Sequence, residues 1–185
     1  MILSTLLACQ QLDATWTKAK NAAVAAKEQA SIESLPCDAD VPREEPHNCI
    51  SGELTCGSVI EGTTEGGDAF WKDDFYSTNF CFPAGDDRSG PERVYLMKVG
   101  AKKDVRIRLD SDCVDLDVAA IAWEYEGTCP TVSHHVAECE ANGRKGGGEV
   151  RLNTFNARDY LVVVEGKNKA SGPFRLTVTC GDLGG

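Results

Sequence analysis

The chain has 185 residues, of which 42% are hydrophobic, and its formal net charge is −10. That length is sufficient for one domain with a full core plus an appendage. Nucleic-acid binding requires a concentrated basic patch, and the sequence contains none, so we exclude that class of protein. Acidity favours solubility and, weakly, the binding of cations.

The nine cysteines are spread along the chain and form no C-x-x-C pair. Zinc sites usually show closely spaced pairs, so this dispersal predicts disulfides and an oxidising compartment. One cysteine, Cys9, stands apart near the N-terminus. The other eight can pair completely: Cys37, Cys49, Cys56, Cys81, Cys113, Cys129, Cys139 and Cys180.

Residues 1–9, M-I-L-S-T-L-L-A-C, resemble the end of a bacterial lipoprotein signal peptide. In that family three aliphatic or small residues precede the cysteine that receives the lipid, and Leu6, Leu7, Ala8 and Cys9 fill those places. The segment lacks a basic n-region and is too short for a signal h-region, so the resemblance implies a reading frame that begins upstream of Met1. It predicts attachment to the membrane through a lipidated Cys9. The alternative interpretation is an apolar N-terminus with a spare thiol.

Residues 10–35 contain seven alanines and neither Gly nor Pro. Alanine has the highest helix propensity, so we expect one helix of about 25 residues. Small residues follow Leu12 and Trp16 at heptad-like spacing, which would allow a partner helix to approach closely. Because only Leu12 and Trp16 are large, a helical tether is favoured over a coiled coil. Contact with an envelope protein partner is predicted at Leu12, Trp16 and Ala19.

Residues 36–48 hold three prolines among acidic residues, a composition that is typical of a linker. From residue 49 onward, apolar and polar residues alternate in short runs, as in Val105, Ile107 and Leu109. Residues 116–125 are apolar on both sides, which is typical of a central strand. The clearest pattern lies in residues 158–180, which we interpret as a hairpin of two strands. Roughly eight strands with no helix between them predict a β-sandwich or jelly roll over residues 49–185.

Six sequence motifs occur in the order found in one bacterial family. They are C-G-S-V-I-E-G-T-T from residue 56, E-R-V-Y-L-M-K-V from 92, D-V-R-I-R-L from 104, D-L-D-V from 115, D-Y-L-V-V-V-E-G from 159 and G-P-F-R-L-T-V from 172. Residues 49–180 thereby resemble the pre-peptidase C-terminal domain, a jelly-roll-like antiparallel β-sandwich, in its disulfide-containing form. One departure is A-R-D at residues 157–159, where the family often has glycine before the tyrosine.

The resemblance implies an accessory module that is appended to secreted hydrolases or stands alone on bacterial surfaces. Such modules are associated with secretion, adhesion or protein interaction rather than catalysis. In these sandwiches the first and last strands lie close together, which implies a Cys56–Cys180 disulfide. Among the 105 possible connectivities, the rest of our hypothesis pairs Cys129 with Cys139, Cys81 with Cys113 and Cys37 with Cys49.

Four acids in the run D-S-D-C-V-D-L-D are candidate Ca²⁺ ligands: Asp110, Asp112, Asp115 and Asp117. Calcium takes six to eight oxygens, so they would supply about half a site. The spacing is not that of an EF-hand, and the alternative is that these are solvated loop acids.

Three aromatic residues, Trp71, Tyr76 and Trp123, are candidates for a carbohydrate-stacking platform, but such residues are more often sandwich core. His134 and His135 are adjacent and lack a metalloprotease motif, and Ser133 lacks the setting of a hydrolase nucleophile, so no catalytic set is evident. The glycine-rich residues 143–148 lack the phosphate-loop pattern and indicate a turn.

These observations predict a non-catalytic, exported bacterial lipoprotein of the outer membrane or cell surface. Its β-sandwich would serve binding or assembly at the envelope and would be held on a helical tether. The alternative is an accessory subunit of a secreted hydrolase that binds a polysaccharide or protein substrate. Calcium is the one cofactor considered.

Overall fold

The computed structural model describes residues 35–42, 49–71, 73–79, 81–82, 87–129, 131, 133–136 and 138–184. In this part of the chain nine strands, one short α-helix and one 3₁₀ turn are formed, which confirms a mainly β protein. In chain order the elements are β1 (Gly52–Leu54), β2 (Val59–Thr63), α2 (Asp73–Thr78), β3 (Glu92–Val99), β4 (Lys103–Asp110), β5 (Leu116–Ala122), β6 (Cys139–Asn142), β7 (Gly147–Thr154), β8 (Arg158–Gly166), η1 (Lys167–Lys169) and β9 (Pro173–Asp182).

The predictions for the N-terminal segment fall almost entirely outside the described residues. They concern the lipidated Cys9, the helix over residues 10–35 and the contact residues Leu12, Trp16 and Ala19, of which the structure describes only the last helix position, Leu35. No helix in the described part of the chain is long and apolar enough to cross a membrane.

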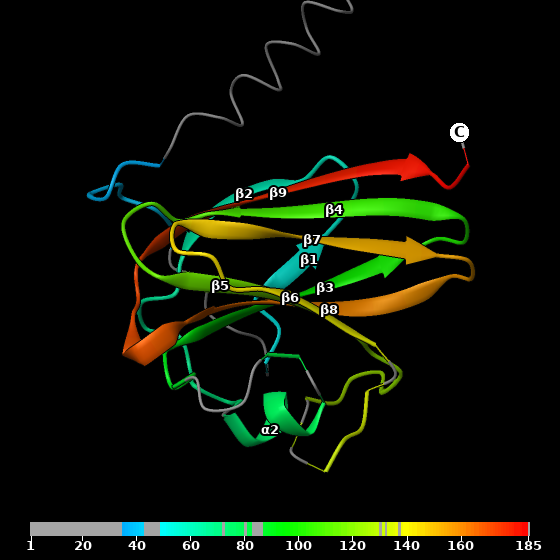
Figure 1. The fold of residues 1–185 in the computed structure, drawn as a ribbon. Coiled ribbons are helices and arrows are strands. Elements are labelled where there is room, and N and C mark those ends of the chain that lie inside the picture. The colour runs from blue at the N-terminus through cyan, green and yellow to red at the C-terminus, as the bar shows by residue number, and fades with distance from the viewer. Residues whose placement is uncertain are drawn as a thin grey trace, which may run out of the picture. The chain divides into compact units, whose positions relative to one another are not determined.

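The strands form two stacked sheets (Figure 1). One sheet has the order β1-β3-β8-β5-β6 and the other the order β2-β9-β4-β7. Neighbouring strands are antiparallel except β1 and β3, which run parallel. The two sheets bury a shared core, because each presents its alternate apolar residues to the other. Its largest fully buried members include Tyr95, Ile107, Leu109, Leu116, Tyr160 and Phe174.

The hairpin predicted over residues 158–180 is wrong. β8 pairs with β3 and β5 in the five-stranded sheet, whereas β9 pairs with β2 and β4 in the other sheet. The connection turns a corner at η1, where Asn168 and Lys169 adopt positive φ values of 52° and 62°. Alternation predicts two strands correctly, but it carries no information about which strands pair, so a sheet-crossing corner and a hairpin look alike in the sequence.

A second layer covers part of the outer face of the five-stranded sheet. Residues 68–71, 73–79 and 81–82, called here the cover segment, include α2, which lies below this sheet in Figure 1. Its aromatic side chains pack on Val94, Ala119, Ile121 and Val163 of the sheet. β5 and β8 are therefore buried on both faces, which explains why their sequences are apolar on both sides. The expectation of no helix between the strands is corrected here, because α2 lies between β2 and β3 and its aromatic pair, Phe75 and Tyr76, is buried against the sheet.

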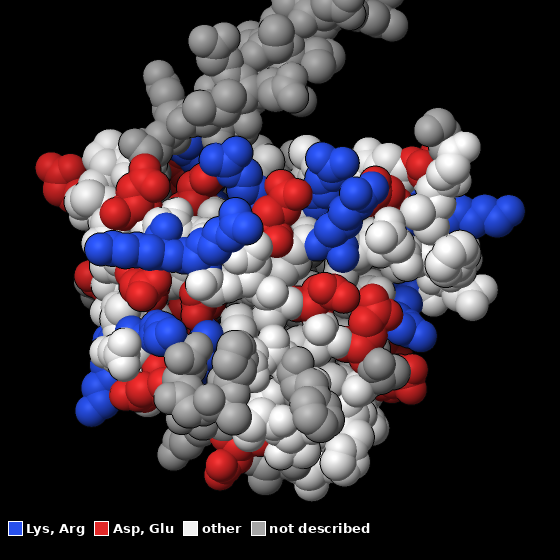
Figure 2. All heavy atoms as spheres, in the orientation of Figure 1, with Lys and Arg blue, Asp and Glu red and all other residues white. Residues whose placement is uncertain are grey.

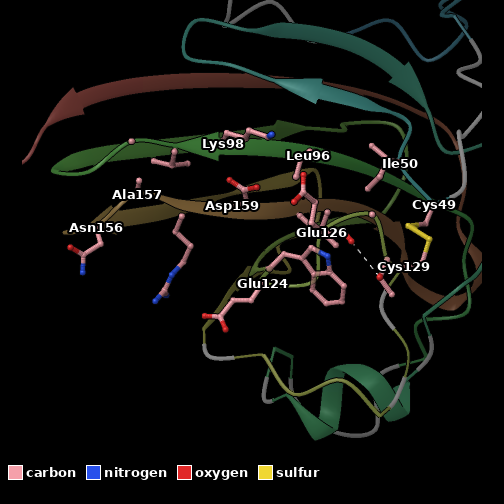
Figure 3. A pocket seen from close by; sticks show the side chains of 17 residues that line it. Cys49, Ile50, Leu96, Lys98, Glu124, Glu126, Cys129, Asn156, Ala157 and Asp159 are labelled. Atoms are coloured by element: carbon pink, nitrogen blue, oxygen red, sulfur yellow. Dashed lines mark hydrogen bonds between the residues drawn. A yellow bond between two sulfur atoms is a disulfide. The ribbon is translucent and has the colours of Figure 1, made fainter.

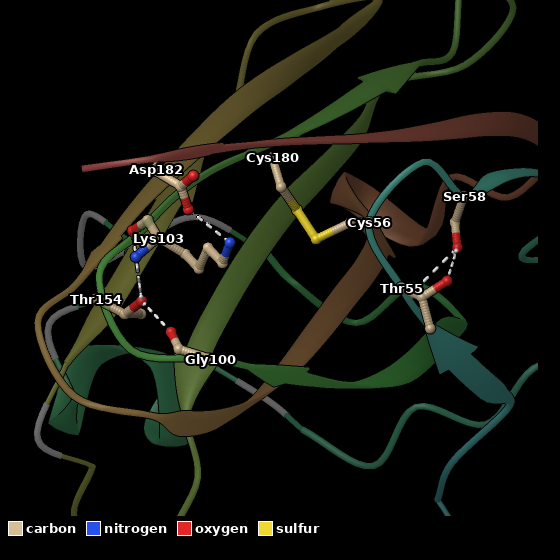
Figure 4. The surroundings of a disulfide bond; sticks show 8 residues. All are labelled: Thr55, Cys56, Ser58, Gly100, Lys103, Thr154, Cys180 and Asp182. Carbon is tan, nitrogen blue, oxygen red and sulfur yellow. Dashed lines mark hydrogen bonds and ion pairs between the residues drawn. A yellow bond between two sulfur atoms is a disulfide. The ribbon is translucent and has the colours of Figure 1, made fainter. Parts of the chain in front are cut away.

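All eight cysteines after residue 36 form disulfides. The Cys56–Cys180 bond joins the segment after β1 to β9, as the family resemblance implied (Figure 4). The other three predicted pairs are wrong: the bonds are Cys37–Cys113, Cys49–Cys129 and Cys81–Cys139.

Tertiary packing explains these partners. Cys139 lies opposite Ile121, which faces the cover segment, and it therefore meets Cys81 of that segment rather than Cys129. Cys113, in the β4–β5 loop, is linked to the linker residue Cys37 instead of to Cys81. The wrong predictions paired cysteines that are closer in the sequence, such as Cys129 with Cys139, whereas the folded chain uses its cysteines to join separate segments.

Charges of both signs are interspersed over the four-stranded sheet, in the upper part of Figure 2. Arg151 on β7 makes a two-bond contact with Asp104 on β4, at 2.6 and 2.8 Å. Arg175 on β9 binds Glu61 on β2 at 2.6 Å. On this face, therefore, ion pairs between neighbouring strands compensate most of the charge.

Candidate functional site

A groove of about 770 Å³ opens on the outer face of the five-stranded sheet (Figure 3). Its floor includes two cross-strand pairs of β3 and β8, Leu96 with Leu161 and Lys98 with Asp159. Leu96 and Leu161 also pack against the cover segment, so the groove occupies the part of this face that the cover segment leaves open. Its volume lies within the range of small-molecule and peptide-side-chain sites.

The walls of the groove are held by covalent and hydrogen bonds. One wall is the loop after β5, and the other begins at Cys49 and Ile50, just before β1. The Cys49–Cys129 disulfide joins these walls. Within the loop, the carbonyl oxygen of Tyr125 accepts hydrogen bonds from Nε1 of Trp123 at 2.8 Å and from the backbone N–H of Thr128 at 3.1 Å. A site with fixed walls loses little conformational entropy when a ligand binds.

Carboxylates dominate the rim of the groove. Glu124 and Glu126 are exposed on the loop wall, and Asp159 lies half-buried on the floor. Within the described residues none of these three forms an ion pair. On the cationic side, Arg158 is bound to Glu138 at 2.9 Å, which leaves Lys98 as the lining cation without such a pair in the described chain. The groove therefore carries an excess of negative charge.

A second polar feature is fully buried beneath the cover segment, and the sequence analysis did not find it. Three acids stand side by side on adjacent strands, since the register places Glu92 of β3 and Asp117 of β5 opposite Glu165 of β8. Each is 3% exposed or less. We call this set the acid ladder. A sequence signal existed for Asp117, which is the one charged residue of the otherwise apolar strand β5.

Arg88 is the main counter-charge of the acid ladder. Its guanidinium binds Asp117 and, at 3.2 Å, Glu165, and it stacks over the ring of Phe82 at 3.4 Å from the ring centroid. The Arg88 segment is positioned by backbone bonds to the β8–β9 corner, from the N–H of Gly90 to Gly166 at 3.1 Å and from the N–H of Asn168 to Asp87 at 2.8 Å. A side chain at residue 90 would clash with the backbone of Gly166, so this approach requires glycine.

Glu92 fastens the other end of the cover segment. Its carboxylate accepts hydrogen bonds from the backbone N–H groups of Trp71 at 2.9 Å and Phe70 at 3.2 Å. Glu92 thus holds the start of the cover segment, at Phe70 and Trp71, and Arg88 contacts its end, at Phe82. Through these two residues the acid ladder connects the cover segment to the sheet. This is a structural role, and none of the ladder residues lines the groove.

Burial shifts the titration of the acid ladder. It raises the pKa of Glu92 to about 9, with the nearby Glu165 adding to the rise. Burial likewise raises the pKa of Glu165 to about 8, although Tyr76 and Arg88 oppose it. The pKa of Asp117 is also raised by burial, against the effect of Arg88. In the described chain, Oε2 of Glu165 and the hydroxyl of Tyr76 are buried without a hydrogen bond of normal geometry, although the two side chains interact electrostatically.

The three aromatic candidates for carbohydrate stacking are core residues, as the alternative interpretation held. Trp71 and Tyr76 are each 1% exposed within the cover segment, and Trp123 is 6% exposed. Trp123 lines the groove but is almost fully buried, because its ring packs on Tyr125 and His134 at centroid distances of 4.9 and 5.3 Å. None of the three offers an open ring face to a sugar.

The four predicted calcium ligands do not converge. Asp110 is bound to Arg108 at 2.8 Å, and its position on β4 directs it away from the sandwich core, whereas Asp117 faces the cover segment and binds Arg88. Asp112 and Asp115 lie in the connecting loop. No group of three or more His, Cys, Asp or Glu side chains in the described chain is arranged to hold a metal ion. Calcium binding at these residues stays a prediction.

Ser133, His134 and His135 lie in the β5–β6 connection. Nδ1 of His134 accepts a hydrogen bond from the backbone N–H of Thr131 at 2.9 Å, and the Thr131 and Ser133 hydroxyls are 2.7 Å apart. These are local turn contacts. Residues 143–146 of the glycine-rich run form the β6–β7 turn, as predicted, and Gly147 and Gly148 begin β7.

No protein-family model matches this chain, and no curated protein matches it. In structure it is similar to the pre-peptidase C-terminal domain of a collagenase from Bacillus anthracis, with 14% identity, 77% of this chain and 99% of that chain covered, and a TM-score of 0.42. It is similar also to PliG of Aeromonas hydrophila, a periplasmic inhibitor of g-type lysozyme, with 10% identity, coverage of 70% and 94%, and a TM-score of 0.40.

A third similar structure is CorA of Methylomicrobium album BG8, a surface-associated copper-binding protein. The identity is 10%, the coverage is 75% of this chain and 99% of that chain, and the TM-score is 0.43. The first of the three structures belongs to the family that the strand motifs of the sequence resemble. We take no activity and no ligand from these three proteins.

Proposed function

We propose that this protein is a non-catalytic binding module that acts outside the cytoplasm. The observation that carries the binding role is the open groove, whose walls are joined by the Cys49–Cys129 disulfide and whose rim holds ionisable side chains that have no partner in the described chain. Charged groups that are left uncompensated beside an apolar floor are typical of a surface that binds something else.

The four disulfides support the proposed location outside the cytoplasm. They link segments that are 58 to 124 residues apart in the sequence, so they form part of the framework of the fold. Such bonds persist in oxidising environments and are rare in the cytosol. Together with the lipoprotein-like residues before Cys9, they support an exported protein that is lipid-anchored at the envelope, with residues 10–35 as its tether.

The alternative role is that of a substrate-binding subunit of a hydrolase, and the buried aromatic residues favour a protein over a polysaccharide as its substrate. A polysaccharide role depended on exposed rings at Trp71, Tyr76 and Trp123, and all three rings are in the core. A protein substrate would use the same groove as any other protein partner, so this form of the alternative needs no separate site.

Export and anchoring can be tested in bacterial cells that carry the gene with its natural upstream region. We expect an alkyne analogue of palmitate to label the protein and expect no label on Cys9→Ser. We expect acid-quenched cells treated with a maleimide reagent to show the eight later cysteines blocked as disulfides. Reduced cysteines together with an unlabelled Cys9 would contradict the proposed location.

A further inference from the structure

The charge around the groove differs from the charge on the rest of the described surface. On the four-stranded sheet, carboxylates such as Asp104 and Glu61 are bound by arginines. In the groove, by contrast, three carboxylates face one ammonium group once Arg158 is counted with Glu138. Unpaired surface charges of one sign attract ligands of the opposite sign.

The floor adds a pattern that suits an extended polypeptide. Along β3 an apolar Leu96 is followed two residues later by Lys98, and along β8 a charged Asp159 is followed two residues later by Leu161. The apolar pair and the charged pair are thus about 7 Å apart, which is the distance between alternate side chains of an extended chain. A ligand strand with an apolar and a charged side chain two positions apart matches this spacing.

We propose that the groove binds an extended basic segment of a partner polypeptide. An apolar side chain of the segment rests on Leu96 and Leu161, and Lys or Arg side chains lie against Glu124, Glu126 and Asp159. This inference depends on the proposed function, since it names the class of ligand for the same site. A sugar is disfavoured because the aromatic ring in the wall, Trp123, is 6% exposed.

The test is an NMR titration of the full chain with a peptide, because this method detects weak binding and shows which residues the peptide contacts. The probe is the synthetic peptide acetyl-Leu-Lys-Val-Arg-Leu-Lys-amide, and the matched control has Glu at every basic position. We expect the basic peptide to shift the indole N–H of Trp123 and the methyl groups of Leu96 and Leu161. We expect the acidic peptide to leave these signals unchanged.

A charge variant and its control separate site binding from general attraction to an acidic protein. Glu124→Gln/Glu126→Gln/Asp159→Asn removes the carboxylates of the groove, and about tenfold weaker binding is expected from the loss of three ion pairs with the peptide. Asp112→Asn/Glu140→Gln/Glu149→Gln removes three exposed carboxylates outside the groove and should leave the affinity within about twofold. Raising the salt concentration from about 20 to about 200 mM should weaken binding of the basic peptide. This measurement uses the wild-type protein, so it does not depend on the folding of a variant.

Three results would overturn the inference: equal binding of the two peptides, equal effects of the two triple variants, or no dependence on salt. Groove shifts produced by a neutral chitin oligosaccharide instead of the basic peptide would also overturn it, while leaving the binding role in place. Failure of palmitate labelling would count against the anchored location and would leave the peptide result unaffected.

Discussion

Glu92 on β3 and Glu165 on β8 lie directly opposite each other, and both carboxyl groups are buried under the cover segment. Two carboxylates in this position would repel each other in a medium of low polarity, so the folded state favours the protonated forms. The outer layer of the protein therefore depends on protons as well as on aromatic packing.

Folding stability should fall as the pH rises from about 5 to about 9. The pKa of a glutamate in the unfolded chain is near 4.5, whereas it is about 9 for Glu92 and about 8 for Glu165 in the folded protein. Between these values the folded protein holds protons that the unfolded chain has released, so each rise in pH favours unfolding. One group contributes up to about 1.4 kcal/mol for each pH unit, so the loss should be steepest below pH 8, where both groups contribute.

Urea unfolding at several pH values measures this effect, and Glu165→Gln is the diagnostic variant. Since glutamine does not titrate, the variant should have a flatter stability profile between pH 6 and 8 than the wild type. A wild-type stability that rises over this range would show that the acid ladder is ionised in the folded protein.

Replacing Arg88 should destabilise the protein strongly. Arg88→Met leaves Asp117 buried without its counter-charge and removes the hydrogen bond from Arg88 to Glu165, at a cost of about 3–5 kcal/mol in the free energy of unfolding. Arg106→Met, on the exposed face of β4, is the control and should change the stability by less than about 0.5 kcal/mol. Equal effects of the two substitutions in denaturant titrations would contradict the role given to Arg88.

The disulfide connectivity can be read by mass spectrometry of a non-reducing digest. We expect peptides joined by Cys37–Cys113, Cys49–Cys129, Cys56–Cys180 and Cys81–Cys139. A linked peptide with Cys129 and Cys139 would contradict this arrangement. Because the Cys56–Cys180 bond spans 124 residues, the paired serine variant should lose about 3–5 kcal/mol of stability.

Truncating an aromatic side chain of the cover segment should cost far more than truncating an exposed one. Phe75 is 1% exposed and packs against Trp71 and Tyr76 at centroid distances of 5.5 Å. Phe75→Ala should therefore lower the free energy of unfolding by about 3–5 kcal/mol. Phe155 in the β7–β8 turn is 77% exposed, and Phe155→Ala should change stability little. Thermal unfolding of the two variants compares them directly, and similar melting temperatures would contradict the burial of α2.

The sequence predicted the strands well because alternation depends on local geometry. Val105, Ile107 and Leu109 on β4 face the core, and Arg106 and Arg108 face away, as their period of two requires. The apolar runs of β5 and β8 correctly indicated central strands. The sequence could not predict that β8 and β9 belong to different sheets, because pairing is a relation between segments.

The candidate site was less accessible to sequence reasoning. The floor of the groove comes from β3 and β8, and one wall comes from the loop after β5. The disulfide that joins its walls links Cys49 to Cys129, which are 80 residues apart in the sequence. The acid ladder likewise joins Glu92, Asp117 and Glu165 from three strands. Each acid by itself looks like an ordinary strand residue.

The sequence by itself determined a mainly β domain, the positions of most of its strands, its dependence on disulfides and its motif resemblance to pre-peptidase C-terminal domains. These properties follow from composition and from periods of a few residues. Only the tertiary structure decided which cysteines bond, which acids are buried and where a ligand can bind. Those properties depend on distances between residues that are far apart in the chain, and such distances are set by how the two sheets and the cover segment pack together.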